Sequence, residues 1–187
     1  MQRALNYATA IIAEGAITRS LASALTCFLL VACASPRSVP VVEIAATFDE
    51  REAQSALVDG GNTVKGNAFM RQRGGGVITC AGQDVQLIPA TGYARERMRY
   101  LYGNDIGPAS NPGVRVTFSP EVLAYLTMVR TARCDSTGNF IFDRVADGEF
   151  FVTTAVVWQV GYSTQGGNLM QRVTLRGGQV VSVILSA

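Results

Sequence analysis

A stripe of arginine and tyrosine side chains is the first pattern in the chain that could bind a partner. Arg95, Arg99 and Tyr102 are spaced so that they would lie along one face of a helix. Arginine and tyrosine are enriched in binding interfaces, so this stripe could bind acidic head groups, a glycan or another protein. A solvated polar helix face would show the same spacing, and the sequence leaves both interpretations open.

The composition excludes several classes of catalytic and metal site. The chain has no histidine, which rules out Ser-His-Asp and Cys-His catalysis, histidine-ligated zinc and a histidine pH switch. The 16 basic and 14 acidic side chains give a formal charge of +2, unlike the concentrated positive charge of a nucleic-acid binder. Asp135, Asp143 and Asp147 are spread over two predicted turns, whereas calcium takes about 6–8 oxygen ligands from one dense loop. We therefore expect no catalytic residue, no metal and no cofactor.

Two further features could serve either structure or binding. Residues 71–76, RQRGGG, could surround an anion, but no helix follows them as one would in a phosphate-binding loop. We interpret them as a flexible hairpin loop. Trp158 alternates with Val156 along a predicted strand, and we interpret it as a core residue rather than a platform for a ligand.

The N-terminal segment has the pattern of an export signal. Arg3 and Arg19 precede residues 21–32, LASALTCFLLVA, which carry no charge. This run is shorter than the roughly 20 residues of a membrane-spanning helix and fits the apolar region of a secretory signal peptide. It ends in residues 30–33, LVAC, which resemble the bacterial lipobox. In that motif the peptide is cut before the cysteine, and the cysteine thiol receives a diacylglycerol group.

The lipobox resemblance implies that residues 1–32 are a lipoprotein signal peptide and that Cys33 is the lipid attachment site. Several acyl chains on one residue anchor a protein stably, whereas a single chain is marginal. Ala34 stands where an aspartate would direct retention, so resemblance to lipoprotein sorting rules implies the periplasmic face of the outer membrane. Residues 33–46 include two prolines and are predicted to form a membrane tether. An ordinary signal peptide, or a buried helix with a chance cysteine, remains the alternative.

The predicted lipoprotein signal assigns a different role to each group of cysteines. Cys27 lies in the discarded segment and Cys33 carries lipid, which leaves Cys80 and Cys134 as one pair in an oxidising compartment. A disulfide between them is the favoured interpretation, and two separate buried thiols are the alternative. A redox site is disfavoured because the pair has no CxxC spacing.

Residues 47–187 show the short alternating segments that are typical of strands. Strands are predicted over residues 62–70, 84–90, 127–134, 149–160, 168–176 and 179–186, with another strand that contains Phe140 and Phe142. Short helices are predicted over residues 48–57 and 91–102, and a further one from Ser119 and Pro120. The last two strands are predicted to form a hairpin across residues 177–178, GG. Short alternating strands with Gly-rich turns indicate a β-sandwich.

One segment carries a resemblance to a known family. Residues 134–152, CDSTGNFIFDRVADGEFFV, are similar to the D-x-x-G-x-F-x-F-x-x-L-x-x-G-x-Y-x-V pattern of carboxypeptidase regulatory-like domains. Residues 63–69, TVKGNAF, resemble the opening strand of that family, and residues 85–87 its second strand. The resemblance implies an all-β, transthyretin-like seven-stranded β-sandwich over residues 47–187, with one or two short helices inserted. It is a signature of fold, and it implies a domain that is not itself catalytic.

These inferences predict a lipid-anchored bacterial envelope protein that acts as a non-catalytic binding or structural module. Its expected partners are the membrane, through the acyl chains, and an envelope protein or glycan, with no nucleic acid. One alternative is a cell-wall or glycan-acting enzyme, which would need two carboxyl groups about 5–9 Å apart in a cleft. The other is an accessory subunit of a surface or secretion assembly.

Overall fold

The structure is a computed structural model that describes residues 38–113 and 115–187. The described residues belong to one compact unit, which ends at Ala187. The predicted signal peptide and Cys33 lie outside the described residues. In the described part of the chain, no helix has both the length and the apolar character needed to cross a membrane.

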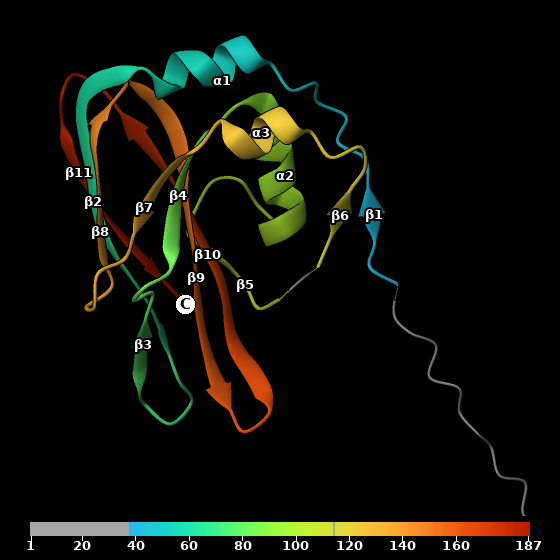
Figure 1. Cartoon of the computed structure of the whole chain (residues 1–187), viewed down its shortest axis with the longest axis vertical. Helices are drawn as coiled ribbons and strands as arrows, with labels where there is room; N and C mark the ends of the chain where they lie inside the picture. Colours follow the sequence, from blue (N-terminus) through green and yellow to red (C-terminus); the bar gives the residue numbers. More distant parts are fainter. Residues whose placement is uncertain (1–37, 114) are drawn as a thin grey trace, which may run out of the picture. The chain divides into compact units, whose positions relative to one another are not determined.

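Two β-sheets make up most of the domain (Figure 1). The first has five antiparallel strands in the order β5 (Ala109–Asn111), β10 (Ser163–Leu175), β9 (Gly148–Val160), β4 (Asp84–Pro89) and β7 (Arg130–Arg133). The second has four strands, β11 (Val180–Ser186), β2 (Asp59–Arg71), β3 (Val77–Thr79) and β8 (Asn139–Val145). In this sheet β11 runs parallel to β2, while β3 and β8 pair antiparallel with β2. The mostly-β, sandwich-like architecture is confirmed, but the predicted count of seven strands is not.

The main core lies between the two sheets and follows the alternation predicted from sequence. Along β9, Phe150, Val152 and Val156 are fully buried in this core, and Trp158 packs at its edge. The intervening Phe151 points to the opposite face, where it belongs to a second apolar cluster. The five-stranded sheet is therefore covered on both faces, which explains why strand β9 carries neighbouring phenylalanines.

Three helices accompany the sheets, α1 (Glu50–Leu57), α2 (Gly92–Tyr102) and α3 (Leu123–Thr127). Asp49 caps α1 by accepting hydrogen bonds from the first-turn backbone, and Thr91 caps α2 in the same way. Gly103 ends α2 in the left-handed region, with a φ of 75°. The second apolar cluster joins α2 and α3 to the outer face of the five-stranded sheet (Figure 1). The first two helices are confirmed close to their predicted bounds.

The predicted C-terminal hairpin is wrong. Strands β10 and β11 belong to different sheets, because β10 is flanked by β9 and β5 while β11 pairs in parallel with β2. The side chains that were expected to face each other do so across the core between the sheets: Val173, Leu175, Val183 and Leu185 are all buried there. Alternation identified the inward faces correctly, but it cannot tell a cross-strand neighbour from a neighbour across a sandwich.

The third helix begins later than predicted. Ser119, expected as its N-cap, instead donates its backbone N–H to Val42 and so continues the pairing of β1 (Val41–Val42) with β6 (Thr117–Phe118). The helix starts at Leu123, without a side-chain cap. Thr127, expected in a strand, is its last residue.

Part of the predicted tether, residues 41–46, contacts the domain. Besides the pairing of β1 with β6, the backbone N–H groups of Ala45 and Ala46 donate to the Glu96 carboxylate at 3.0 and 2.8 Å. These contacts hold residues 41–46 against the domain. Any tether would therefore lie before Val41, and residues 33–37 are outside the described part.

A disulfide between Cys80 and Cys134 confirms the predicted pair, with 5.8 Å between the two Cα atoms. Cys80 follows β3 of the four-stranded sheet, and Cys134 follows β7, an edge strand of the five-stranded sheet. Both cysteines are buried in the main core. The bond therefore joins the two sheets covalently along one edge of the sandwich.

Candidate functional site

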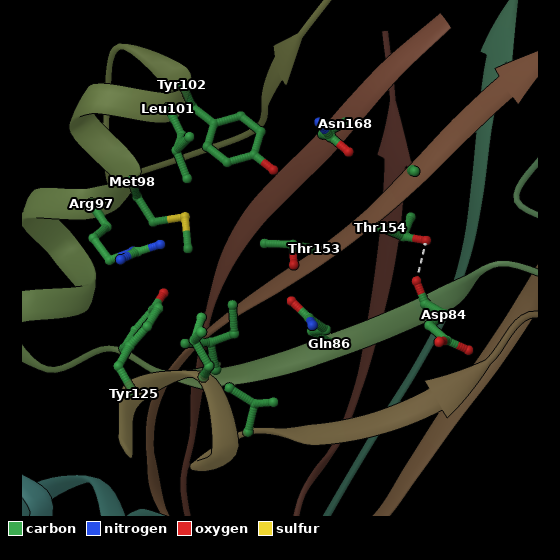
Figure 2. Close-up of a pocket in the computed structure, with 14 residues that line it drawn as sticks. Asp84, Gln86, Arg97, Met98, Leu101, Tyr102, Tyr125, Thr153, Thr154 and Asn168 are labelled. Atoms are coloured by element: carbon green, nitrogen blue, oxygen red, sulfur yellow. Dashed lines mark hydrogen bonds between the residues drawn. The ribbon is translucent and has the colours of Figure 1, made fainter. Parts of the chain in front are cut away.

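A hollow of about 360 Å³ lies between the outer face of the five-stranded sheet and helices α2 and α3 (Figure 2). We call it the helix-side hollow. The sheet contributes mostly polar side chains, Asp84, Gln86, Thr153, Thr154 and Asn168, and the helices contribute Arg97, Met98, Leu101, Tyr102, Tyr125 and Leu126. The segment of residues 93–126, which interrupts the strand pattern, thus forms the roof over a polar patch of sheet.

The floor of the hollow is set by strand register. Gln86 on β4 pairs with Thr153 on β9, and Ala155 on β9 pairs with Asn168 on β10, so these side chains share one face of the sheet. Their neighbours in sequence, such as Val85 and Leu87 on β4, point into the core instead. Gln86 and Asn168 are exposed to the solvent in the hollow.

The polar groups of the floor are available to a ligand. Within residues 38–113 and 115–187, the side chains of Gln86, Thr153 and Asn168 have no hydrogen-bond partner, whereas the Thr154 hydroxyl donates to the Asp84 carbonyl at 2.8 Å. Side-chain amides both donate and accept, and a hydroxyl can do either. This set of uncharged groups matches the alternating donors and acceptors of a polyhydroxylated molecule.

Two tyrosines enclose the hollow from the helix side (Figure 2). Burial raises the pKa of Tyr102 above its ordinary range, with repulsion from Tyr125 adding to the effect. Burial likewise raises the pKa of Tyr125 to about 12. Both phenols therefore stay neutral at physiological pH. The Tyr125 ring is buried against Arg97 and Tyr93, whereas Tyr102 is only partly buried, so Tyr102 is the tyrosine whose ring and hydroxyl group can face a ligand.

Arg97 is a fixed cation in the wall of the hollow. Its guanidinium carbon lies 3.8 Å from the Phe118 ring centroid and 4.6 Å from that of Tyr125. Its Nη1 is 2.5 Å from a Glu121 carboxylate oxygen and donates to the Tyr93 hydroxyl at 3.4 Å. Burial by itself would lower the pKa of Arg97, but the hydrogen bonds to Tyr93 and Glu121 outweigh it and the pKa is raised. The buried Arg97 Nε has no hydrogen-bond partner among the described residues.

The arginine and tyrosine stripe predicted from sequence does not form one surface. Arg95 donates to Glu149, and Arg99 pairs with Asp105 at 3.1 Å, so each arginine is bound to a carboxylate. Tyr102 turns into the helix-side hollow instead (Figure 2). Of the three predicted residues, the structure thus brings only Tyr102 to the candidate site.

Sequence reasoning missed the residues of the sheet floor. Gln86 and Asn168 belong to strands far apart in the sequence, and each is an outward polar position next to buried apolar residues of its strand. Outward polar residues usually mean solvent exposure, which is why alternation alone assigned them no role. The available signal was the short helices predicted over residues 91–102 and from Ser119, which are able to cover such a face.

A smaller hollow beside α1 gathers three carboxyl groups, those of Glu52, Asp147 and Glu149. A hydrogen bond from the Asn62 side chain is the largest cause that lowers the pKa of Asp147, and one from Arg95 does the same for Glu149. A general acid needs a raised pKa. In the structure these two carboxylates accept hydrogen bonds from neighbouring side chains.

The aspartates considered for calcium serve turns and strand contacts. Asp135 accepts hydrogen bonds from Thr137 and Asn139, and Asp143 accepts one from Thr63. Across the described part of the chain, no three His, Cys, Asp or Glu side chains are grouped so as to hold a metal ion.

A comparison with known protein families and with curated proteins finds no match. Among solved structures, the chain is similar to a proposed carbohydrate-binding protein from Pseudomonas aeruginosa, with 26% sequence identity and a TM-score of 0.59. The similarity covers 76% of this chain and 99% of that protein. Chlorocatechol 1,2-dioxygenase from Pseudomonas putida also matches, with 11% identity over 82% of this chain and 68% of the enzyme and a TM-score of 0.29. Membership of the carboxypeptidase regulatory-like family stays a prediction.

Proposed function

We propose that the protein is a non-catalytic carbohydrate-binding module of the bacterial envelope, and that the helix-side hollow binds the saccharide. The observation that carries this proposal is the floor of free amide and hydroxyl groups, Gln86, Asn168 and Thr153, facing the neutral tyrosines Tyr102 and Tyr125. A small set of convergent polar groups in a partly apolar hollow is the usual form of a small-ligand site. Similarity to the Pseudomonas aeruginosa protein supports the same class of ligand.

A saccharide ring fits this arrangement chemically. Its hydroxyl groups would exchange hydrogen bonds with the amides of Gln86 and Asn168, and its C–H face would lie against a tyrosine ring. Arg97, held by Glu121, keeps the roof in place and lines the wall of the hollow. No nucleophile or metal is needed, because the proposed role is binding and no bond is broken.

The test of the hollow is calorimetric titration of the whole chain with neutral trisaccharides, namely maltotriose, cellotriose and chitotriose. Gln86→Ala and Asn168→Ala should each weaken binding about fivefold, since one hydrogen bond contributes about 1 kcal/mol. Gln54→Ala, on the exposed side of α1, is the matched control and should bind like the unchanged chain. If none of the three trisaccharides binds, or if all three variants bind equally, the proposal is wrong.

The proposed anchor is the acyl-modified Cys33, which would hold the module on the periplasmic face of the outer membrane. Its support is the sequence alone, in the apolar run that ends in residues 30–33. In a bacterial host, radiolabelled palmitate should appear on the chain and on Cys27→Ser but not on Cys33→Ser. A Cys33→Ser chain that is still cleaved and still membrane-bound would contradict this anchor while leaving the saccharide proposal intact.

A further inference from the structure

A second hollow lies at the end of the sandwich where two hairpins come together. One hairpin joins β2 to β3 and the other joins β9 to β10, and both extend to the same end of the sheets (Figure 1). The space between them measures about 690 Å³ and shares no lining residue with the helix-side hollow. We call it the hairpin-end hollow.

Trp158 forms the aromatic surface of this hollow. It is half-buried, with one side against the main core, and it lines the hollow. Gly166 makes room for it on the neighbouring strand, because a Cβ at residue 166 would lie 2.9 Å from Cζ3 of the indole. Gln165 pairs with Trp158 in the β9–β10 ladder and also lines the hollow. An indole with one packed and one open side can act as a platform for a ring.

The hollow carries a net positive charge, because two arginines and one main-chain carboxylate line it. Arg71 ends β2 and Arg73 lies in the following turn, and both are exposed. Among the described residues neither forms an ion pair, in contrast to Arg95, Arg97 and Arg99, which each pair with a carboxylate. No aspartate or glutamate is among the described residues that line the hollow, and its one carboxylate is the main-chain carboxylate of Ala187, which accepts a hydrogen bond from the Arg71 backbone N–H at 3.5 Å. The two guanidinium groups are thus free to bind an anion.

We propose that the hairpin-end hollow is a second saccharide site, specific for a sugar that carries a carboxylate. The C–H face of the pyranose ring lies on the Trp158 indole, the carboxylate binds Arg71 and Arg73, and the Gln165 amide contacts a ring hydroxyl. Arginine suits this role because its planar fork of donors matches the two oxygens of a carboxylate. The inference rests on the proposed carbohydrate-binding function for its class of ligand, but on none of the residues of the helix-side hollow.

The single tryptophan of the chain gives this site its own signal. Trp158 fluorescence is measured on the whole chain while trigalacturonate is added, and again with its fully methyl-esterified, uncharged form. We expect trigalacturonate to change the emission and the ester to do so at least about tenfold more weakly, since charged hydrogen bonds are the stronger ones. Arg71→Gln and Arg73→Gln should each weaken the response to trigalacturonate about tenfold. Arg51→Gln, an exposed arginine on α1, is the matched control and should leave it unchanged.

Each other result overturns the inference. No fluorescence change at millimolar trigalacturonate means that no such site exists. An equal response to the ester means that the carboxylate is not recognised, and an equal loss in Arg51→Gln means that overall charge explains the effect. Gln86→Ala, in the helix-side hollow, should not alter this signal. If the unchanged chain binds none of the neutral trisaccharides but still gives the fluorescence response, only the proposed role of the helix-side hollow is contradicted.

Discussion

A single exposed carboxylate organises the turn between β7 and β8. The Asp135 side chain accepts hydrogen bonds from the backbone N–H groups of Asn139 and Thr137 and from both of their side chains. These bonds, led by that from the Asn139 backbone, lower the pKa of Asp135 to about 2. The folded pKa thus lies below the unfolded value of about 4, so the turn adds stability above that pH. This contribution is lost as the pH falls toward 2.

Titration of the Asp135 carboxyl by NMR should therefore show a midpoint near 2. Thr137→Val removes the hydroxyl donor while keeping the side-chain volume, so the midpoint should rise toward the ordinary aspartate value. The backbone donors remain, so the rise should be partial. An ordinary aspartate midpoint in the unchanged chain would contradict this account of the turn.

Gly138 closes the same turn in a conformation that favours glycine. Its φ is 84°, and a Cβ would lie 2.7 Å from the Thr79 Cβ and 2.9 Å from the Ala68 carbonyl oxygen. Gly138→Ala should lower the free energy of unfolding by about 1–3 kcal/mol or more, measured by urea denaturation. Gly74→Ala is the control, because a Cβ there meets nothing within 4 Å. Equal stability of the two variants would show that the turn can rearrange at no cost.

At the scale of the elements, the sequence predicted the features that depend on neighbouring residues, namely the helix bounds and the inward faces of the strands. The predicted bounds of α1 and α2 lie close to the observed ones, where Asp49 and Thr91 cap the helices and Gly103 ends α2. Alternation placed the inward faces of β9 and β10 correctly. It could not place β11, because residues 177–178 can lead either to the adjacent strand or across to the other sheet. That choice depends on which strand edges are already paired, and β10 has β9 and β5 on its two sides.

The disulfide is the covalent link between elements of different sheets. Cys80 and Cys134 are 54 residues apart, and the chain-entropy model assigns closure of such a loop about 4 kcal/mol, which is an upper estimate. Replacing both cysteines by alanine should lower the free energy of unfolding by up to this amount, and the urea midpoint should fall with it. Adding reductant to the native chain should lower its urea midpoint as well. An unchanged midpoint in the double variant would mean that the reduced unfolded chain is already constrained.

At the scale of the whole molecule, the candidate site depends on contacts that no sequence window contains. Gln86, Tyr102 and Asn168 meet only because β4 lies beside β9, β9 beside β10, and α2 packs over all three through the second apolar cluster. Residue type alone directed attention to Arg95 and Arg99, whose charges the fold uses for ion pairs. Tyr102 was found because it is an aromatic on the same helix. The uncharged side chains of the sheet could be recognised as a site only once the structure showed that α2 and α3 cover them.

The boundary between anchor and module is also a property of the whole molecule. Strand β1 pairs with β6, and the N–H groups of Ala45 and Ala46 donate to the Glu96 carboxylate on α2 and so lower its pKa. These contacts fix residues 41–46 to β6 and α2. A chain that begins at residue 38 should therefore melt like the full-length protein. One that begins at residue 47 loses these contacts, so it should melt at a lower temperature and the Glu96 pKa should rise toward its ordinary value. Thermal melts followed by circular dichroism, with NMR titration of Glu96, measure both effects. Identical melting of the two shortened chains would mean that residues 41–46 belong functionally to the tether, because their contacts with β6 and α2 would then add no stability to the saccharide-binding domain.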